Sequence, residues 1–351
     1  MYKLVLNEEG ITESFYPLTL TRSFVDLKAG IFSIRERWER MALQQNIEFE
    51  WLTNIGDEKV PFKSIPANYI PPASLNLKDF FTKNIPLDQL EFKKVNYLWD
   101  LIALNEWLIK NDINLVKEQK NDSGLAKING DFPVLVGSNV KLENCIINAQ
   151  DGPVFIDDNA LIMEGAILRG PIYIGKGTVI KMGAIIYGGT SIGAYCSVGG
   201  ELKNSIILGY TNKAHHGYIG NSYIGEWCNL GAGTSCSNVK NTLGEIKVWD
   251  MSTKEFKYGG KKVGIFMGDH VKTAIHTGFN SGTVIGPFSN IFEFEGLTHK
   301  FINSFSWGGK SNTIYKIDKL FIEIDRWMAL KNIDFTRDNQ EKIRTLYLKM
   351  K

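Results

Sequence analysis

The sequence has little of several features that would place it in familiar protein classes. Its 351 residues include only four cysteines, and these lack the spacing of metal ligands. No apolar run approaches the roughly 20 residues of a membrane-spanning helix. The formal net charge is only +2, and the nearest basic cluster, residues 254–262, is interrupted by an acid and by glycines. We therefore expect no metal site of cysteines, no membrane contact and no nucleic-acid partner.

The first residues and the cysteines indicate a cellular compartment. The opening MYKLVLNEEG has a lysine and two glutamates where a secretory signal would be apolar. Cys196 and Cys228 fall at positions that the repeat described below places inside the protein. Buried, unpaired thiols are typical of a reducing compartment. We expect a cytoplasmic protein whose cysteines are reduced core residues.

The strongest positive signal is a run of aliphatic residues spaced six apart. A helix would place apolar residues three and four apart, and a half-buried strand would alternate, so a period of six fits neither. It is typical of a parallel β-helix, in which each hexad forms one side of a triangular coil and three hexads form one turn. The aliphatic residues are Ile156, Ile162, Leu168, Ile174, Ile180, Ile186, Ile192 and Val198.

The repeat loses its phase twice. Two extra residues separate Val198 from the next clear hexad at Ile224, and a longer excursion runs from Val239 to Val263. Within this excursion, residues 245–249 and 255–258 could form a hairpin. We expect both interruptions to be loops, which in solenoids often lie on the binding face.

Three regions follow from these patterns. Residues 1–130 predict an α/β domain with strands at 2–6 and 49–53 and helices at 31–45 and 98–110. Residues 131–310 predict the β-helix. Residues 311–351 predict a helical cap with helices at 315–330 and 338–349.

Polar residues gather around the first interruption in three ordered motifs. They are Glu201-Leu-Lys-Asn, Asn212-Lys-Ala-His, and Asn229-Leu-Gly-Ala-Gly-Thr with an asparagine at 238. In this order the segment resembles the acetyltransferase domain of the bacterial bifunctional enzyme that makes UDP-N-acetylglucosamine. The closer resemblance is to bacterial sugar nucleotidyltransferase-like proteins with a hexapeptide-repeat domain. This resemblance implies a left-handed coil and covers about residues 134–310.

The resemblance implies transfer of an acyl group, as in acetyl-CoA-dependent acetylation, to an amino sugar phosphate or sugar nucleotide. A histidine would accept the proton of the attacking amine, since imidazole titrates near neutral pH. His215 and His216 both remain candidates, because counting from Lys203 favours the first and counting from Lys213 favours the second. The resemblance also implies two groups of binding residues. Substrate binding would fall to Lys203, Lys213, Tyr218, Asn229, Asn238 and Tyr187, and cofactor binding to Gly231, Ala232, Gly233, Thr273 and Ala274.

Structural explanations compete with several of these roles. Asn229 could form a ladder with an asparagine of a neighbouring turn, and the glycines after it could simply ease a corner of the coil. Trp227 and Trp307 are expected to be packing residues. Tyr187 stands where the acetyltransferase has an arginine that grips phosphate, which leaves the acceptor sugar open.

The N-terminal region resembles a reduced or divergent nucleotidyltransferase. Such enzymes cradle a triphosphate in a glycine-rich loop after the first strand, but here the loop has one glycine and three acids. Arg22 and Lys28 are the best remaining phosphate ligands, with solvent exposure as the alternative. Asp131 is the one tempting Mg²⁺ ligand, but it directly precedes the first coil, where an ordinary linker turn is the simpler explanation.

Three functional hypotheses remain. The favoured one is a cytoplasmic homotrimeric acyltransferase of cell-envelope sugar metabolism, with sites between neighbouring coils. The second is a Mg²⁺-dependent sugar-1-phosphate nucleotidyltransferase whose coil serves only to form the trimer. The third is a non-catalytic scaffold that binds sugar nucleotides.

Overall fold

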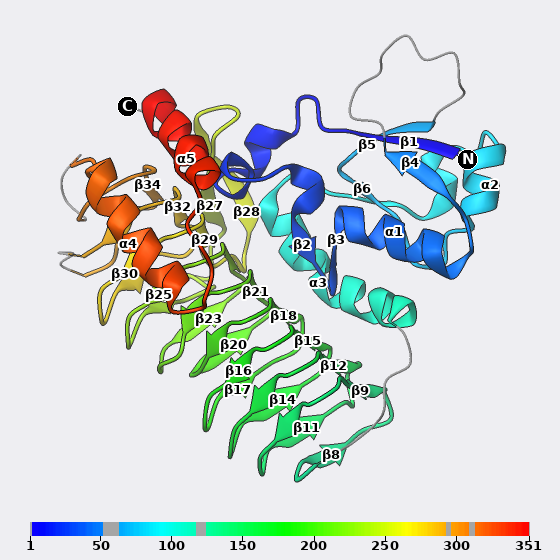
Figure 1. Ribbon diagram of the computed structural model, residues 1–351, viewed down its shortest axis with the longest axis horizontal. Helices are drawn as coiled ribbons and strands as arrows, with labels where there is room; N and C mark the ends of the chain where they lie inside the picture. Colours follow the sequence, from blue (N-terminus) through cyan, green and yellow to red (C-terminus); the bar gives the residue numbers. More distant parts are fainter. Residues whose placement is uncertain (1, 52–62, 117–123, 293–295, 309–312, 351) are drawn as a thin grey trace.

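The computed structural model describes residues 2–51, 63–116, 124–292, 296–308 and 313–350. Figure 1 shows three parts: a coil of short strands, an α/β region lying against one side of it, and two helices near its final turns.

The coil has three parallel faces with 8, 8 and 9 strands, all in parallel register. These strands confirm the predicted left-handed parallel β-helix. Face A consists of β10 (Lys141–Leu142), β13 (Leu161–Ile162), β16 (Val179–Ile180), β19 (Ser197–Val198), β22 (Asn212–Lys213), β25 (Asn229–Leu230), β30 (Lys272–Thr273) and β33 (Asn290–Ile291). Face B consists of β8 (Lys127–Asn129), β11 (Ile146–Asn148), β14 (Ile167–Arg169), β17 (Ile185–Ile186), β20 (Glu201–Lys203), β23 (Tyr218–Gly220), β26 (Ser235–Cys236) and β31 (Gly278–Phe279). Face C consists of β9 (Val134–Val136), β12 (Val154–Ile156), β15 (Ile172–Ile174), β18 (Thr190–Ile192), β21 (Ile206–Ile207), β24 (Tyr223–Ile224), β29 (Phe266–Met267), β32 (Val284–Ile285) and β34 (Phe301–Ile302).

The hexad residues fill the coil. All eight aliphatic residues of the predicted run are at most 1% exposed and share one apolar core. The chain runs from face A to B to C, so each of the first five residues of the run stacks on the one eighteen positions later. The four cysteines are free and buried, as predicted, and burial raises the pKa of Cys196 and Cys228 to about 12.

The first interruption is not a loop, which corrects our expectation. Between Val198 and Ile224 the coil adds three inward residues, Leu202, Ile207 and Ile219, together with Lys213. The steps are four, five, six, six and five residues, because several corners are shortened. The chain therefore packs five sides where we expected four sides and two inserted residues, and His215 and His216 lie on a corner of the coil.

The second interruption is a true excursion. It contains the expected hairpin, formed by β27 (Ile246–Asp250) and β28 (Glu255–Gly260) in antiparallel pairing. Ile246 and Val248 are buried in a core shared with the N-terminal region. The hairpin thus joins the coil to the α/β region.

The N-terminal region has a parallel sheet in the order β4 (Phe49–Trp51), β1 (Tyr2–Asn7), β5 (Lys63–Pro66). The expected strands at 2–6 and 49–53 are confirmed as β1 and β4, and positions 52 and 53 lie outside the described residues. The expected helices are α1 (Ile34–Gln44) and α3 (Leu98–Asp112). The shorter elements are η1 (Thr12–Phe15), η2 (Leu18–Leu20), η3 (Phe24–Asp26), β2 (Lys28–Ala29), β3 (Phe32–Ser33), β6 (Tyr69–Ile70), α2 (Leu77–Thr82), η4 (Leu87–Leu90), β7 (Lys93–Lys94) and η5 (Ile113–Leu115).

Helix α3 holds this region on face C. The side chain of Asn105 accepts from Gly30 N at 2.6 Å and donates to Gly189 O at 2.6 Å. Ser191 Oγ donates to Gly30 O at 2.7 Å. A buried amide with both ends satisfied fixes the two parts in one orientation.

Helices α4 (Ile317–Ala329) and α5 (Arg337–Met350) confirm the expected C-terminal helices. They bury Leu320, Ile324 and Ile343 in a separate core with Phe288 and Phe305 of the coil. The helices therefore cover the corner between faces C and A over the last turns.

Candidate functional site

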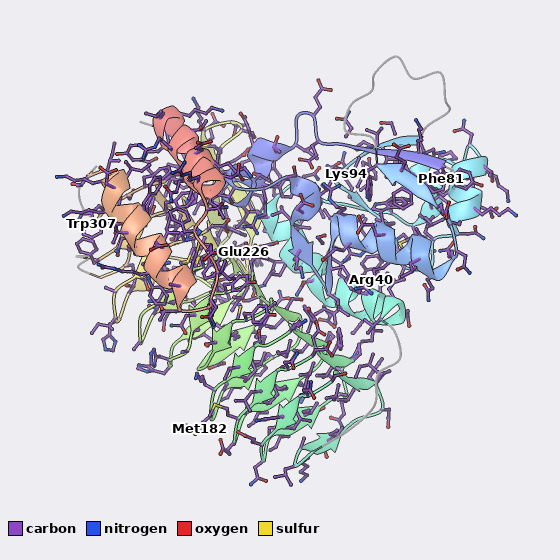
Figure 2. The ribbon with its side chains drawn as sticks, viewed as in Figure 1. Arg40, Phe81, Lys94, Met182, Glu226 and Trp307 are labelled. Atoms are coloured by element: carbon purple, nitrogen blue, oxygen red, sulfur yellow. The ribbon has the colours of Figure 1, made fainter. Side chains whose placement is uncertain are left out.

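His215 and His216 lie on the corner between faces A and B, between β22 and β23, and both are exposed. Met182 occupies the same corner two turns earlier and is 66% exposed. Figure 2 shows Met182 at the outer edge of the coil, away from the N-terminal region. The histidine pair is therefore open to solvent on a surface that the other two parts of the chain leave uncovered.

Lys213 holds this corner from inside the coil. It occupies an inward position in register with Val198 and is only 2% exposed. Its Nζ donates to the carbonyls of Gly199, His215 and Gly217 at 3.0, 2.7 and 2.9 Å. Burial lowers the pKa of Lys213 to about 8. An ammonium has three donors, and all three are used here, so the expected role of Lys213 as a sugar or phosphate ligand does not fit this arrangement.

Gly200 leaves the space that the three hydrogen bonds of Lys213 Nζ need; we call these three bonds the clamp. Its φ is +71°, and a Cβ there would come within 2.8 Å of both Lys213 Nζ and His215 O. Only glycine adopts this conformation at low cost and leaves that space. A glycine at position 200 is therefore required both by the backbone conformation and by the position of the Lys213 ammonium.

Face B carries the remaining charged and phenolic candidates beside the histidines. Lys203 Nζ lies 5.4 Å from the centre of the Tyr187 ring. Tyr218 pairs with Glu201 across neighbouring strands. Burial, with smaller contributions from Glu201, Cys236 and Tyr187, raises the pKa of Tyr218. The structure thus brings Tyr187, Lys203 and Tyr218 onto one face, and Lys203 keeps an exposed ammonium that can meet an anion.

The two asparagines lie apart. Asn229 is on face A, where its Oδ1 accepts from Asn212 Nδ2 at 2.6 Å, so it forms the ladder that was the structural alternative. Asn238 is at the corner between faces B and C, and its Nδ2 donates to Asn221 Oδ1 at 2.5 Å. Within one chain they flank face B from opposite sides and do not converge.

The expected cofactor residues continue the histidine corner. Gly231, Ala232 and Gly233 are partly exposed one turn after the histidines, and Ala274 is partly exposed one turn further. Thr273 instead points into the coil, where its Oγ1 is 2.9 Å from Thr234 Oγ1. It is 6% exposed, so a cofactor contact from its side chain does not fit.

His276 is a member of this column that the sequence analysis missed. It is exposed, its φ is +57°, and its ring centre is 6.1 Å from that of His216. The signal was available, because the hexad phase resumes at Met267 and places residue 276 above Gly233. The weak aliphatic pattern of these last turns concealed it.

The candidate phosphate ligands of the N-terminal region are engaged within the protein. Arg22 Nη2 donates to Asp269 Oδ2 and lies 3.5 Å from Glu226 Oε2. Burial opposes its charge, but Asp269 and Glu226 outweigh burial and raise the pKa of Arg22. Lys28 Nζ is 3.9 Å from Glu36 and partly exposed. Arg22 therefore links the N-terminal region to the coil.

The loop after β1 supplies its own anion. The carboxylate of Glu8 accepts from Phe24 N at 3.0 Å and from Val25 N at 3.2 Å. These are backbone donors of the kind that a phosphate cradle would offer. Asp131 is exposed in the turn before β9, and no group of three or more His, Cys, Asp or Glu among the described residues could hold a metal ion.

A cavity of about 360 Å³ lies where the three parts meet. Figure 2 shows Glu226 at this junction. Trp227 and His270 line the cavity and belong to a stack of rings along the corner between faces C and A. Trp227 is therefore a packing residue, as expected.

No helix in the described part of the chain is long and apolar enough to cross a membrane.

Comparisons with known proteins agree with this architecture. Residues 4–68 match the family described as sugar nucleotidyl transferase. The coil and the match together define a β-helix protein with a nucleotidyltransferase-like N-terminal domain, and they confirm the resemblance that the motifs indicated.

Particular relatives extend the match. A bifunctional sugar-1-phosphate nucleotidylyltransferase/acetyltransferase of Sulfurisphaera tokodaii is 32% identical over 196 residues, which are 55% of this chain and 43% of the relative. The bifunctional protein GlmU of Methanocaldococcus jannaschii is 38% identical over 86 residues, 24% of this chain and 21% of the relative. The aligned part is thus less than half of each relative, and these relatives are transferases.

Two solved structures were also matched. An Arabidopsis UDP-N-acetylglucosamine acyltransferase is 14% identical with a TM-score of 0.20, and the match covers 63% of this chain and 94% of that one. The polySia specific acetyltransferase NeuO is 18% identical with a TM-score of 0.25, and the match covers 60% and 98%. The strand pairing of this chain itself shows the β-helix.

Proposed function

We propose that the protein is a CoA-dependent acyltransferase that acetylates an amino sugar phosphate or sugar nucleotide, in the cytoplasm and for cell-envelope sugar metabolism. The observation that carries the proposal is the exposed histidine pair held in place by a buried lysine. A plain coil has no need of a charged group in its interior, because burying an ammonium is costly. Here the buried ammonium of Lys213 fixes the backbone of a corner that bears two potential bases.

The chemistry follows from the positions of these groups. One of the two histidines accepts a proton from the sugar amine while the amine nitrogen attacks the thioester carbonyl. The C–S bond then breaks, the sugar amide forms, and the proton passes to the CoA thiolate. Lys203 beside Tyr187 would meet a sugar phosphate, and the corner Gly231–Gly233 would lie along the pantetheine arm.

The proposal includes a homotrimer. Face B presents an outward row of Ile146, Ile167 and Ile185 that are 38 to 40% exposed. Contiguous apolar rows on a sheet are typical of surfaces that meet a partner. A second coil on this face would bring its own polar residues to the histidine corner, where one chain alone leaves Asn229 and Asn238 apart.

The test is formation of an acetylated product from acetyl-CoA and glucosamine 1-phosphate by wild type, H215A and H216A. Loss of a general base lowers kcat by about 10²-fold or more, so we expect that loss in one variant and little change in the other. His299→Ala, an exposed histidine outside this corner, is the control. Equal turnover in all four proteins would refute the role of the histidine pair. No acetylated product from any of them, wild type included, would refute the proposal and favour a scaffold that binds sugar nucleotides without turnover.

A second candidate function has its own observation, the family match of residues 4–68. It is nucleotidyl transfer to a sugar 1-phosphate, with Mg²⁺ needed only for this activity. The engagement of Arg22 and Glu8 within the protein weighs against it. Release of pyrophosphate from UTP or dTTP with Mg²⁺ and a sugar 1-phosphate would support it, and no release would exclude these substrates.

A further inference from the structure

Two lysines lie at the edge of the hairpin where strand β27 begins. Lys240 Nζ donates to the carbonyl of Glu245, and Lys300 Nζ donates to the carbonyl of Lys247 at 3.0 Å. Glu245 directly precedes β27, and Lys247 is its second residue. The charge of Lys240 acts on Lys300, so the two ammonium groups are held near one another.

This edge faces a corner of the coil. A Cβ on Gly282 would come within 2.6 Å of the Lys247 carbonyl, so β27 lies directly against the corner between faces B and C. Lys240 follows Asn238 by two residues, and Asn238 occupies the same corner one turn earlier. The lysine pair is thus continuous with the outer end of face B.

The pair has no negative partner within the part of the chain that the structure describes. Neither Lys240, Lys247 nor Lys300 is within ion-pair distance of a carboxylate there, whereas Lys257 of the same hairpin pairs with Asp250. Burial and the charges of Lys240 and Lys247 lower the pKa of Lys300. Each ammonium of the pair uses one donor on a carbonyl and has two left.

We propose that Lys240 and Lys300 form a binding site for a phosphate or pyrophosphate group. Two ammonium groups held near one another suit a group with several charged oxygens, and each has two donors left to meet such a group. A bound phosphate would offset the repulsion among the three lysines. The positions of the pair are also fixed, because each ammonium donates to a backbone carbonyl.

The source of the phosphate is either the acyl donor, through the phosphates of CoA, or the acceptor, through a sugar phosphate. This choice rests on the proposed acyltransferase function, but the anion site itself does not. Inorganic pyrophosphate is therefore the first probe, because it tests the site without assuming any reaction.

The experiment is calorimetric titration of the full-length protein with pyrophosphate, in low salt because exposed charges are screened. The variants are the double change Lys240→Met with Lys300→Met and, as a control of equal charge per site, Lys261→Met with Lys262→Met at the end of the hairpin. We expect saturable binding by wild type and the control, and about 10-fold weaker binding by the first double variant, since that variant loses its charge-assisted hydrogen bonds to the anion and solvent screening limits their contribution.

The outcomes separate the claims. Equal pyrophosphate affinity in all three proteins, or no binding by wild type, would overturn the site. Circular dichroism and thermal unfolding check that both double variants are folded. A loss of CoA affinity without a loss for glucosamine 1-phosphate assigns the site to the donor, and the reverse assigns it to the acceptor. If the Lys240→Met, Lys300→Met variant loses pyrophosphate binding and wild type forms no acetylated product, the site is supported and the acyltransferase proposal is rejected.

Discussion

Replacing Lys213 by methionine removes the clamp under the histidine corner while keeping an apolar side chain of similar length in the coil. The neighbouring inward residues Val198 and Leu230 are aliphatic, so the methionine can pack between them. The carbonyls of Gly199, His215 and Gly217 then lose their common donor. The histidine corner should become mobile while the rest of the coil stays folded.

The magnitude follows from opposing contributions. Each hydrogen bond from a charged donor contributes about 1.5 to 3 kcal/mol. Burial of the ammonium opposes this, because a pKa of about 8 in place of 10.5 corresponds to about 3 kcal/mol. With the corner carbonyls able to reach water in the variant, we expect K213M to lose roughly 2 kcal/mol of free energy of unfolding at pH 7.

Catalysis should suffer more than stability. A misplacement of about 1 Å can cost on the order of 10²-fold in rate, so kcat should fall between about 10-fold and 100-fold with a smaller change in KM. Hydrogen exchange of residues 214–218 measures the loss of order directly. Lys203→Met, which removes an exposed lysine of face B, should leave that exchange unchanged. Unchanged exchange in K213M would refute the clamp.

The remaining predictions concern pH and two buried positions. The pKa of Lys213 is lower in the folded protein, so the folded state binds fewer protons between about pH 8 and 10.5. The free energy of unfolding of wild type should therefore rise with pH, relative to that of K213M, across this window. Chemical denaturation measures both, and parallel curves of free energy against pH would contradict the prediction. Arg37 makes two hydrogen bonds of 2.8 Å to Asp112 in the core, so Arg37→Met should cost about 3 to 5 kcal/mol by urea unfolding, and a loss below 1 kcal/mol would be inconsistent with that pairing. Gly30 has a φ of +76°, and a Cβ there would come within 2.3 Å of Asp112 Oδ2, so Gly30→Ala should lower the melting temperature clearly; an unchanged melting temperature would argue against this packing.

The sequence predicted the coil because its signal is redundant. From Ile156 to Ile180, each aliphatic residue of the run stacks on the residue of the run one turn later, so a single period specifies face, register and core. The same reasoning failed where corners shorten. Counting in sixes misses the steps of four and five residues that bring Leu202 and Ile207 inward. A loop was therefore predicted where the coil continues.

The site was harder to predict because side-chain direction depends on the register. Lys213 carries the charge of a ligand, but its inward position in the hexad makes it a structural donor. Thr273 points inward for the same reason. Arg22 could not be assigned from sequence because its partner Asp269 is 247 residues away and becomes a neighbour only when the N-terminal region docks on the coil.

Binding of acetyl-CoA tests the central claim most directly, because it requires no knowledge of the acceptor. Calorimetric titration of the full-length protein should show saturable binding of about one acetyl-CoA per subunit, with loss of binding for analogues that lack the pantetheine arm. No heat and no competition at millimolar acetyl-CoA would contradict the assignment of acyl transfer to the coil.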